Sequence, residues 1–124
     1  MKKRLYTQTK DDCWRIALCN FLKISPKKVP HFVKRYDEQF VEETKKWLNK
    51  RGKSIIYLPF SSFLESGNLY VSNSLCPQGR CIAILEKETD LDNNHACFME
   101  NGKLLETPGR NYDKLIGFFI IYNL

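Results

Sequence analysis

The hydrophobic residues follow a helical period in the first half of the chain and gather into short β-rich runs in the second half. One helix is predicted from Asp12 or Cys13 to about Lys23, and a short one opens at Ser25-Pro26, where a serine can cap the first turn that proline favours. The buried face of the first helix carries Trp14, Ala17, Leu18, Phe21 and Leu22. A third helix presents Phe40, Val41, Thr44, Trp47 and Leu48 on one face, and Gly52 suits its end.

After Gly52 the pattern changes to strands. The runs that predict strands are SIIYLPF, NLYVS, CIAILEK, HACFME, KLLE and IGFFIIYNL. Asn101-Gly102 joins two of them and indicates a two-residue hairpin, because both central positions need positive φ. Helices followed by antiparallel strands predict an α+β fold, and with no linker or repeat we expect one domain over residues 1–124. The first helix should pack across a sheet with CIAILEK, HACFME and KLLE at its centre.

The composition is that of a globular protein, with 43% hydrophobic and 27% charged residues. The longest apolar run, Ile116 to Tyr122, is far shorter than the ~20 residues that cross a bilayer, so we expect no membrane association. The net charge of +6 comes from lysines and arginines interleaved with acids, without an aromatic-rich motif, which disfavours nucleic acid as a partner. A basic start, Met1 to Arg4, is followed by polar residues rather than by an apolar export signal, so a cytoplasmic location is expected.

The cysteines give no sign of a disulfide framework or a metal site. The five of them are Cys13, Cys19, Cys76, Cys81 and Cys97, an odd number that favours free thiols in a cytoplasmic protein. A zinc site would need Cys76 with Cys81 and His95 with Cys97, but these pairs are looser than zinc knuckles. We therefore predict no metal and no cofactor, and interpret Cys19 and Cys97 as buried core residues.

Cys13 stands where the first helix begins. Unpaired amides and the positive end of the helix dipole favour thiolate there, so its pKa should be lowered and it should be a good nucleophile. Attack on a carbonyl also requires donors for the oxyanion, and Gln8, on the approach to the helix, could supply one beside the Cys13 amide.

Two histidines could act as the base for this thiol. His31, in VPHF, is interpreted as a packing or capping residue. His95 should open a strand after a polar loop at 89–94, exposed enough to exchange protons and anchored by the sheet. His95 is therefore the predicted general base.

Together these residues resemble a known family. A glutamine, a cysteine opening the first long helix and a histidine starting a later strand are similar to the papain-like cysteine peptidases in their minimal form, especially the leader peptidases of bacteriocin exporters. A closer resemblance is to small uncharacterised proteins, many from phage genomes, with a "DC-R…VPHF" opening, a "PRG" stretch and "HAV…DG…DP". The matching pieces here are Asp12-Cys13-Trp14-Arg15, Val29-Pro30-His31-Phe32, Pro77-Gln78-Gly79-Arg80, His95-Ala96-Cys97-Phe98, Asn101-Gly102 and Thr107-Pro108.

The resemblance implies a papain-like fold, with N-terminal helices packed on an antiparallel sheet, and a site made of Cys13, His95, Gln8 and a residue that orients the histidine. Four residues separate Gln8 from Cys13, one fewer than in the leader peptidases. The aspartate of "DP" is replaced by Thr107, with Glu106 one position earlier; neighbours in a strand face opposite sides, so only one of them can face His95. Glu106 is the predicted orienter if a bulge turns it inward, and otherwise the site is a Cys–His dyad.

Two functions follow from the resemblance and remain open at this point. One is a monomeric cysteine hydrolase that cleaves a peptide or isopeptide bond of a protein or peptide substrate through a thioester, which an amine could also intercept. The other is a protein of the same fold without turnover, which binds or inhibits a host factor.

Overall fold

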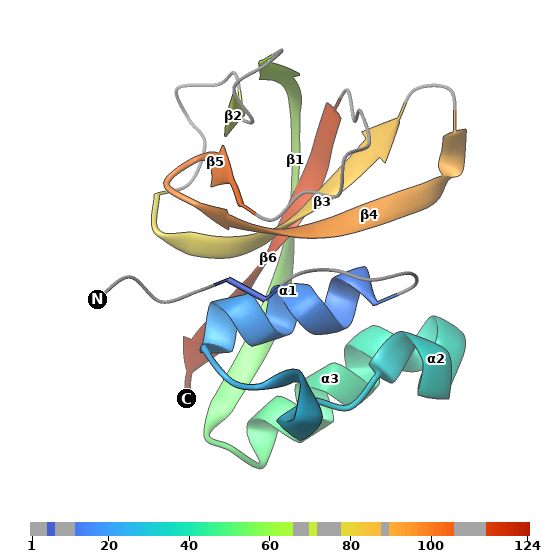
Figure 1. Ribbon diagram of the computed structural model, residues 1–124, viewed down its shortest axis with the longest axis vertical. Coiled ribbons are helices and arrows are strands. Elements are labelled where there is room, and N and C mark those ends of the chain that lie inside the picture. Colours follow the sequence, from blue (N-terminus) through green and yellow to red (C-terminus); the bar gives the residue numbers. More distant parts are fainter. Residues whose placement is uncertain (1–4, 7–11, 66–69, 72–77, 88–89, 106–113) are drawn as a thin grey trace.

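The computed structural model describes residues 5–6, 12–65, 70–71, 78–87, 90–105 and 114–124, and it has helices first and strands afterwards (Figure 1). The helical elements are α1 (Cys13–Leu22), η1 (Pro26–Lys28), α2 (Phe32–Tyr36), η2 (Asp37–Gln39) and α3 (Phe40–Asn49). The strands are β1 (Lys53–Glu65), β2 (Tyr70–Val71), β3 (Arg80–Lys87), β4 (Asp90–Glu100), β5 (Lys103–Leu104) and β6 (Lys114–Asn123). The predicted α+β class is confirmed, and each predicted strand run overlaps one observed strand.

The strands pair antiparallel throughout and close into a barrel in the order β1-β2-β5-β4-β3-β6. The sequence predicted an antiparallel sheet but not its closure. β3 and β4 are neighbours in the barrel, with 8 and 11 residues, whereas β5 is only two residues long; because the barrel is closed, none of the three is a central strand. Figure 1 shows α1 lying against the sheet below β4, with α2 and α3 on its far side.

Alternation along the strands divides the core in two. On β3, Ile82 belongs to the cluster that packs on the helices, while Ala83 belongs to a second cluster on the other face of the sheet. On β4, Ala96 and Phe98 face the helices and Cys97 the opposite side. This division decides which side chains of β4 can meet α1.

The predicted hairpin joins β4 to β5. Asn101 has φ of 52° and Gly102 of 81°, as a turn with two left-handed residues requires. The Asn101 side-chain oxygen also accepts a 2.7 Å hydrogen bond from the amide of Gly79. The hairpin therefore ties the start of β3 to the end of β4.

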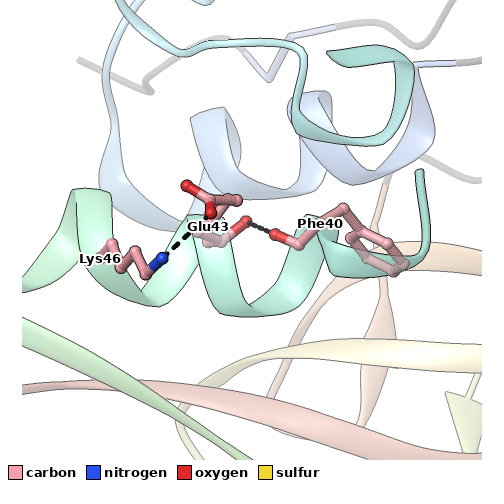
Figure 2. A network of polar contacts seen from close by, with 4 residues as sticks. Phe40, Glu43 and Lys46 are labelled. Carbon is pink, nitrogen blue, oxygen red and sulfur yellow. Dashed lines mark hydrogen bonds and ion pairs between the residues drawn. The ribbon is translucent and has the colours of Figure 1, made fainter. Parts of the chain in front are cut away.

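A buried hydrogen bond links α1 to α3. The indole nitrogen of Trp14 donates to the Thr44 hydroxyl at 3.0 Å, and this hydroxyl donates to the carbonyl of Phe40 at 2.7 Å. Figure 2 shows the Phe40 carbonyl on α3, together with the ion pair between Glu43 and Lys46 on the same helix. Because the indole N–H is satisfied, Trp14 can lie in the core at 3% exposure.

The "DC-R…VPHF" stretch has a structural basis. The Arg15 guanidinium donates to the backbone carbonyls of Val29 and Pro26, which fixes the turn after α1. His31 is the N-cap of α2, where its Nδ1 accepts a hydrogen bond from the amide of Lys34 at 3.2 Å. The prediction that His31 is a capping residue is confirmed, although α2 itself was not predicted.

Candidate active site

Cys13 is the first residue of α1, as the sequence predicted. Asp12 occupies the N-cap position, and its backbone carbonyl accepts the first helical bond, from Ile16, at 3.0 Å. A short carboxylate at this position, from Asp11 or Asp12, is expected to accept hydrogen bonds from the first turn, but the Asp12 side chain makes no such capping bond. Its charge acts on the cysteine instead.

Burial is the largest influence on the Cys13 thiol, and it raises the pKa. Hydrogen bonds with the backbone of Ala96, Trp14 and Cys13 itself lower the pKa, which means that amides donate to the sulfur as expected at a helix start. The negative charge of Asp12 raises it again. The net shift is upward, so the expectation of a lowered pKa is wrong: the thiol is half-buried, and desolvation outweighs the amides.

His95 lies inside β4 and not at its start. The strand begins at Asp90, because the β3–β4 ladder continues past a bulge to the pair of Lys87 with Asp90. The His95 side chain is 6% exposed, and its Nε2 atom is buried. The expectation of an exposed histidine beside a loop is therefore wrong, since pairing with β3 carries it into the core.

The structure brings the start of α1 to the backbone next to His95. The hydrogen bond of Cys13 with Ala96 places the sulfur one residue from the histidine along β4. Among the described residues, β5 pairs with β4 at Met99 and Glu100, further along the strand than Ala96. The N-terminus of α1 lies against β4 near Ala96.

The side-chain directions on β4 limit how the two groups can meet. His95 pairs with Leu85 and shares its face with Cys97, whereas Ala96 faces α1. The His95 side chain therefore does not share the face of β4 that packs on α1.

Gln8, Glu106 and Thr107 lie outside the described residues; the described residues nearest to them in the chain are Tyr6 and Leu105. Tyr6 is held to α1 by Asn20, whose side-chain oxygen accepts from the Tyr6 amide at 2.7 Å. Leu105, the last described residue before Glu106, donates its amide to Phe98 at 2.9 Å and accepts from the Cys97 thiol at 3.0 Å.

The other described cysteines differ from Cys13. Cys19, Cys81 and Cys97 are buried, and Cys13 is half-buried; Cys76 lies outside the described residues. The expected core positions of Cys19 and Cys97 are confirmed. Among the described residues no group of three histidine, cysteine or acidic side chains could hold a metal ion.

Sequence reasoning missed one contributor to the site, the backbone amide of Ala96. A backbone amide cannot be recognised from the type of its residue in the sequence. This amide lies near Cys13 because α1 packs on β4. Only the family resemblance indicated that His95-Ala96 would lie close to Cys13.

Comparisons with protein-family models, with curated proteins and with solved structures give no match for this chain. Among the described residues, no helix is long and apolar enough to span a membrane. Function must therefore be argued from the site itself.

Proposed function

We propose that this protein is a papain-like cysteine hydrolase that cleaves a peptide or isopeptide bond, with Cys13 as nucleophile and His95 as general base. The observation that carries the proposal is the packing of α1 on β4, which puts Cys13, at the start of the helix, against the cluster that contains Ala96, the neighbour of His95. Cys13 and the backbone next to His95 are far apart in sequence and adjacent in space, and this supports a pairing of the thiol with the histidine.

The raised pKa of Cys13 shapes the mechanism. A neutral thiol is a poor nucleophile, so the proton must leave as attack begins, and His95 accepts it. The sulfur then bonds to the carbonyl carbon, and the oxyanion is held by the Cys13 amide together with the Gln8 side chain. His95 returns the proton to the amine, which departs, and a thioester remains.

Hydrolysis completes the cycle. His95 takes a proton from water, the hydroxide attacks the thioester carbon, and the acid product leaves as the sulfur regains a proton. If an amine replaces water, the same thioester gives acyl transfer. Glu106 would orient the His95 ring and stabilise its charged form. The substrate is a protein or peptide, and the proposed enzyme is a cytoplasmic monomer that needs no cofactor.

The pH profile of Cys13 alkylation tests the pairing without a known substrate. Iodoacetamide labelling, followed by mass spectrometry, should show an inflection set by His95 well below the raised pKa of the thiol. The His95→Gln variant should lose this inflection and leave only the thiol's own titration, while His31→Gln, which changes a capping histidine, should keep it. Identical profiles for wild type and His95→Gln would refute the Cys13–His95 pair.

Substitutions at the proposed orienter test the triad. With a substrate identified by mass-spectrometric comparison of partners trapped by Cys13→Ala and wild type, Cys13→Ala and His95→Ala should abolish turnover. Glu106→Gln should lower the apparent pKa of His95 and reduce activity less severely, and Thr107→Ala should be close to neutral. Damage from Thr107→Ala with a silent Glu106→Ala would instead indicate a dyad.

A second function, binding or inhibition of a host factor without turnover, is favoured by two specific observations. His95 is buried, and the Cys13 thiol is made less acidic by its surroundings. A binding protein would keep its biological effect in Cys13→Ala, whereas the proposed hydrolase would lose it.

A further inference from the structure

A groove runs across the surface at the far end of α1 from Cys13. Its first part has a volume of 490 Å³ and an apolar floor of Leu22, Ile24, Trp47 and Leu48. Its second part, of 380 Å³, shares Leu22 and Lys53 with the first and continues along β6. Each volume falls in the range of about 300–1,000 Å³ that ligand sites occupy.

Four cations border this groove. They are Lys28, Arg51 and Lys53 around the first part and Arg80 beside the second, and no acidic residue lines either part. None of the four makes an ion pair with a described carboxylate. The C-terminal ends of α1 and α3 lie nearby and offset about half a charge each, so a net charge of roughly +3 remains to attract an anion.

The positions of three of these cations, Arg51, Lys53 and Arg80, are fixed by neutral partners. The Arg51 guanidinium donates to the carbonyl of Trp47 at 3.0 Å, and the Lys53 ammonium donates to the Asn123 side-chain oxygen at 2.7 Å. Arg80 donates to the carbonyl of Phe21 at 2.7 Å. Because these contacts leave other N–H donors on each group, a bound anion meets a set of charges that is already positioned.

The aromatic rings of the groove distinguish a peptide from a nucleic acid. Bases bind single-strand proteins by stacking on open aromatic faces. Here Arg51 covers the Trp47 ring at 4.0 Å, and Arg80 lies over the Phe21 ring at 5.0 Å. Each ring already has a guanidinium on a face, which leaves the aliphatic residues of the floor, Leu22, Ile24 and Leu48, to contact a hydrophobic side chain.

We propose that this groove binds an acidic polypeptide segment, which places one large apolar side chain over Leu22, Ile24 and Leu48 and its carboxylates beside the four cations. The ten residues of α1 span about 15 Å, so this site is separate from Cys13. The proposal therefore stands whether or not the protein is a hydrolase, and Cys13→Ala should bind the segment as wild type does.

Fluorescence anisotropy with a labelled acidic peptide that contains a single central phenylalanine tests the proposal. The double variant Lys28→Gln/Lys53→Gln should weaken binding about tenfold or more at low salt, since it removes two charges at the site. The matched control Lys34→Gln/Lys45→Gln removes two exposed charges that do not line the groove, and it should change affinity less than twofold. Equal losses in both variants would overturn the proposal, because they would mean attraction by net charge alone.

Two further measurements fix the site and the class of ligand. The peptide should change the fluorescence of Trp47, and this change should be absent from Trp47→Phe, since Trp14 is buried elsewhere. A thymidine oligonucleotide of equal charge should bind more weakly than the peptide. Tighter binding of the oligonucleotide, or peptide binding with no response from Trp47, would overturn the proposal.

Discussion

Removal of the Cys19 thiol should make the protein less sensitive to alkaline pH. Cys19 is fully buried on α1, and burial raises its pKa from 9.0 to about 11. In the unfolded chain the thiol ionises first, so the folded state holds the proton over a range where the unfolded state has lost it. Stability is therefore unaffected well below pH 9 and falls as the pH rises from about 9 to about 11.

The size of the effect follows from the two pKa values. At pH 10 the unfolded thiol is about nine-tenths ionised and the folded thiol about one-tenth, which lowers the free energy of unfolding by about 1.4 kcal/mol. Well above pH 11 the loss reaches about 2.7 kcal/mol, two pKa units at 1.36 kcal/mol each. Arg15 limits the shift by favouring the thiolate.

Urea unfolding in the presence of reductant measures this effect. Cys19→Ala and Cys19→Val differ in packing, but neither ionises, so each variant should gain about 1.4 kcal/mol relative to wild type between pH 7 and pH 10. Other titrating groups are common to the three proteins and cancel in the comparison. A difference between wild type and both variants that stays constant over this range would refute the reasoning.

Two smaller predictions concern α1. Asp12→Asn should lower the pKa of Cys13 and speed its reaction with iodoacetamide at pH 8, because a nearby negative charge is removed. Glu42→Gln, on α3, is the control and should leave this rate unchanged. An unchanged rate in Asp12→Asn would contradict the electrostatic account. Thr44→Val should lower the free energy of unfolding, measured in urea, by about 1–3 kcal/mol, because it leaves the buried Trp14 N–H without its acceptor. Thr44→Ser keeps the hydroxyl and should lower it much less. Equal losses in the two variants would mean that the hydrogen bond is not the cause.

The elements of the fold were predictable because they depend on local patterns. The helical spacing after Cys13 and the change of period after Gly52 identified α1 and all six strands. Asn101-Gly102 identified the β4–β5 turn because the required backbone conformation is itself local. Closure of the barrel was not predictable, since it depends on pairings such as β1 with β6, which join segments far apart in the chain.

The candidate site was predictable in its residue types but not in its electrostatics. The position of Cys13 at a helix start follows from the sequence, and so does the direction in which backbone amides shift its pKa. The opposing and larger influence, burial, is set by the packing of α1 on β4. The burial of the His95 side chain could not be predicted either, because it depends on how far β4 continues its pairing with β3.

The two proposed functions differ in what the buried environment of Cys13 is for. In a binding protein, a neutral thiol at a packed helix start needs no base, and the packing of α1 on β4 serves only the stability of the fold. In a hydrolase, the same burial keeps the thiol protonated until an acyl group arrives, and the amides already directed at the sulfur stabilise the charge that develops as the proton leaves. A base must then stand within reach, and His95 is the histidine next to the amide that contacts the sulfur. The raised pKa thus makes the hydrolase depend on His95 more strongly than a preformed thiolate would.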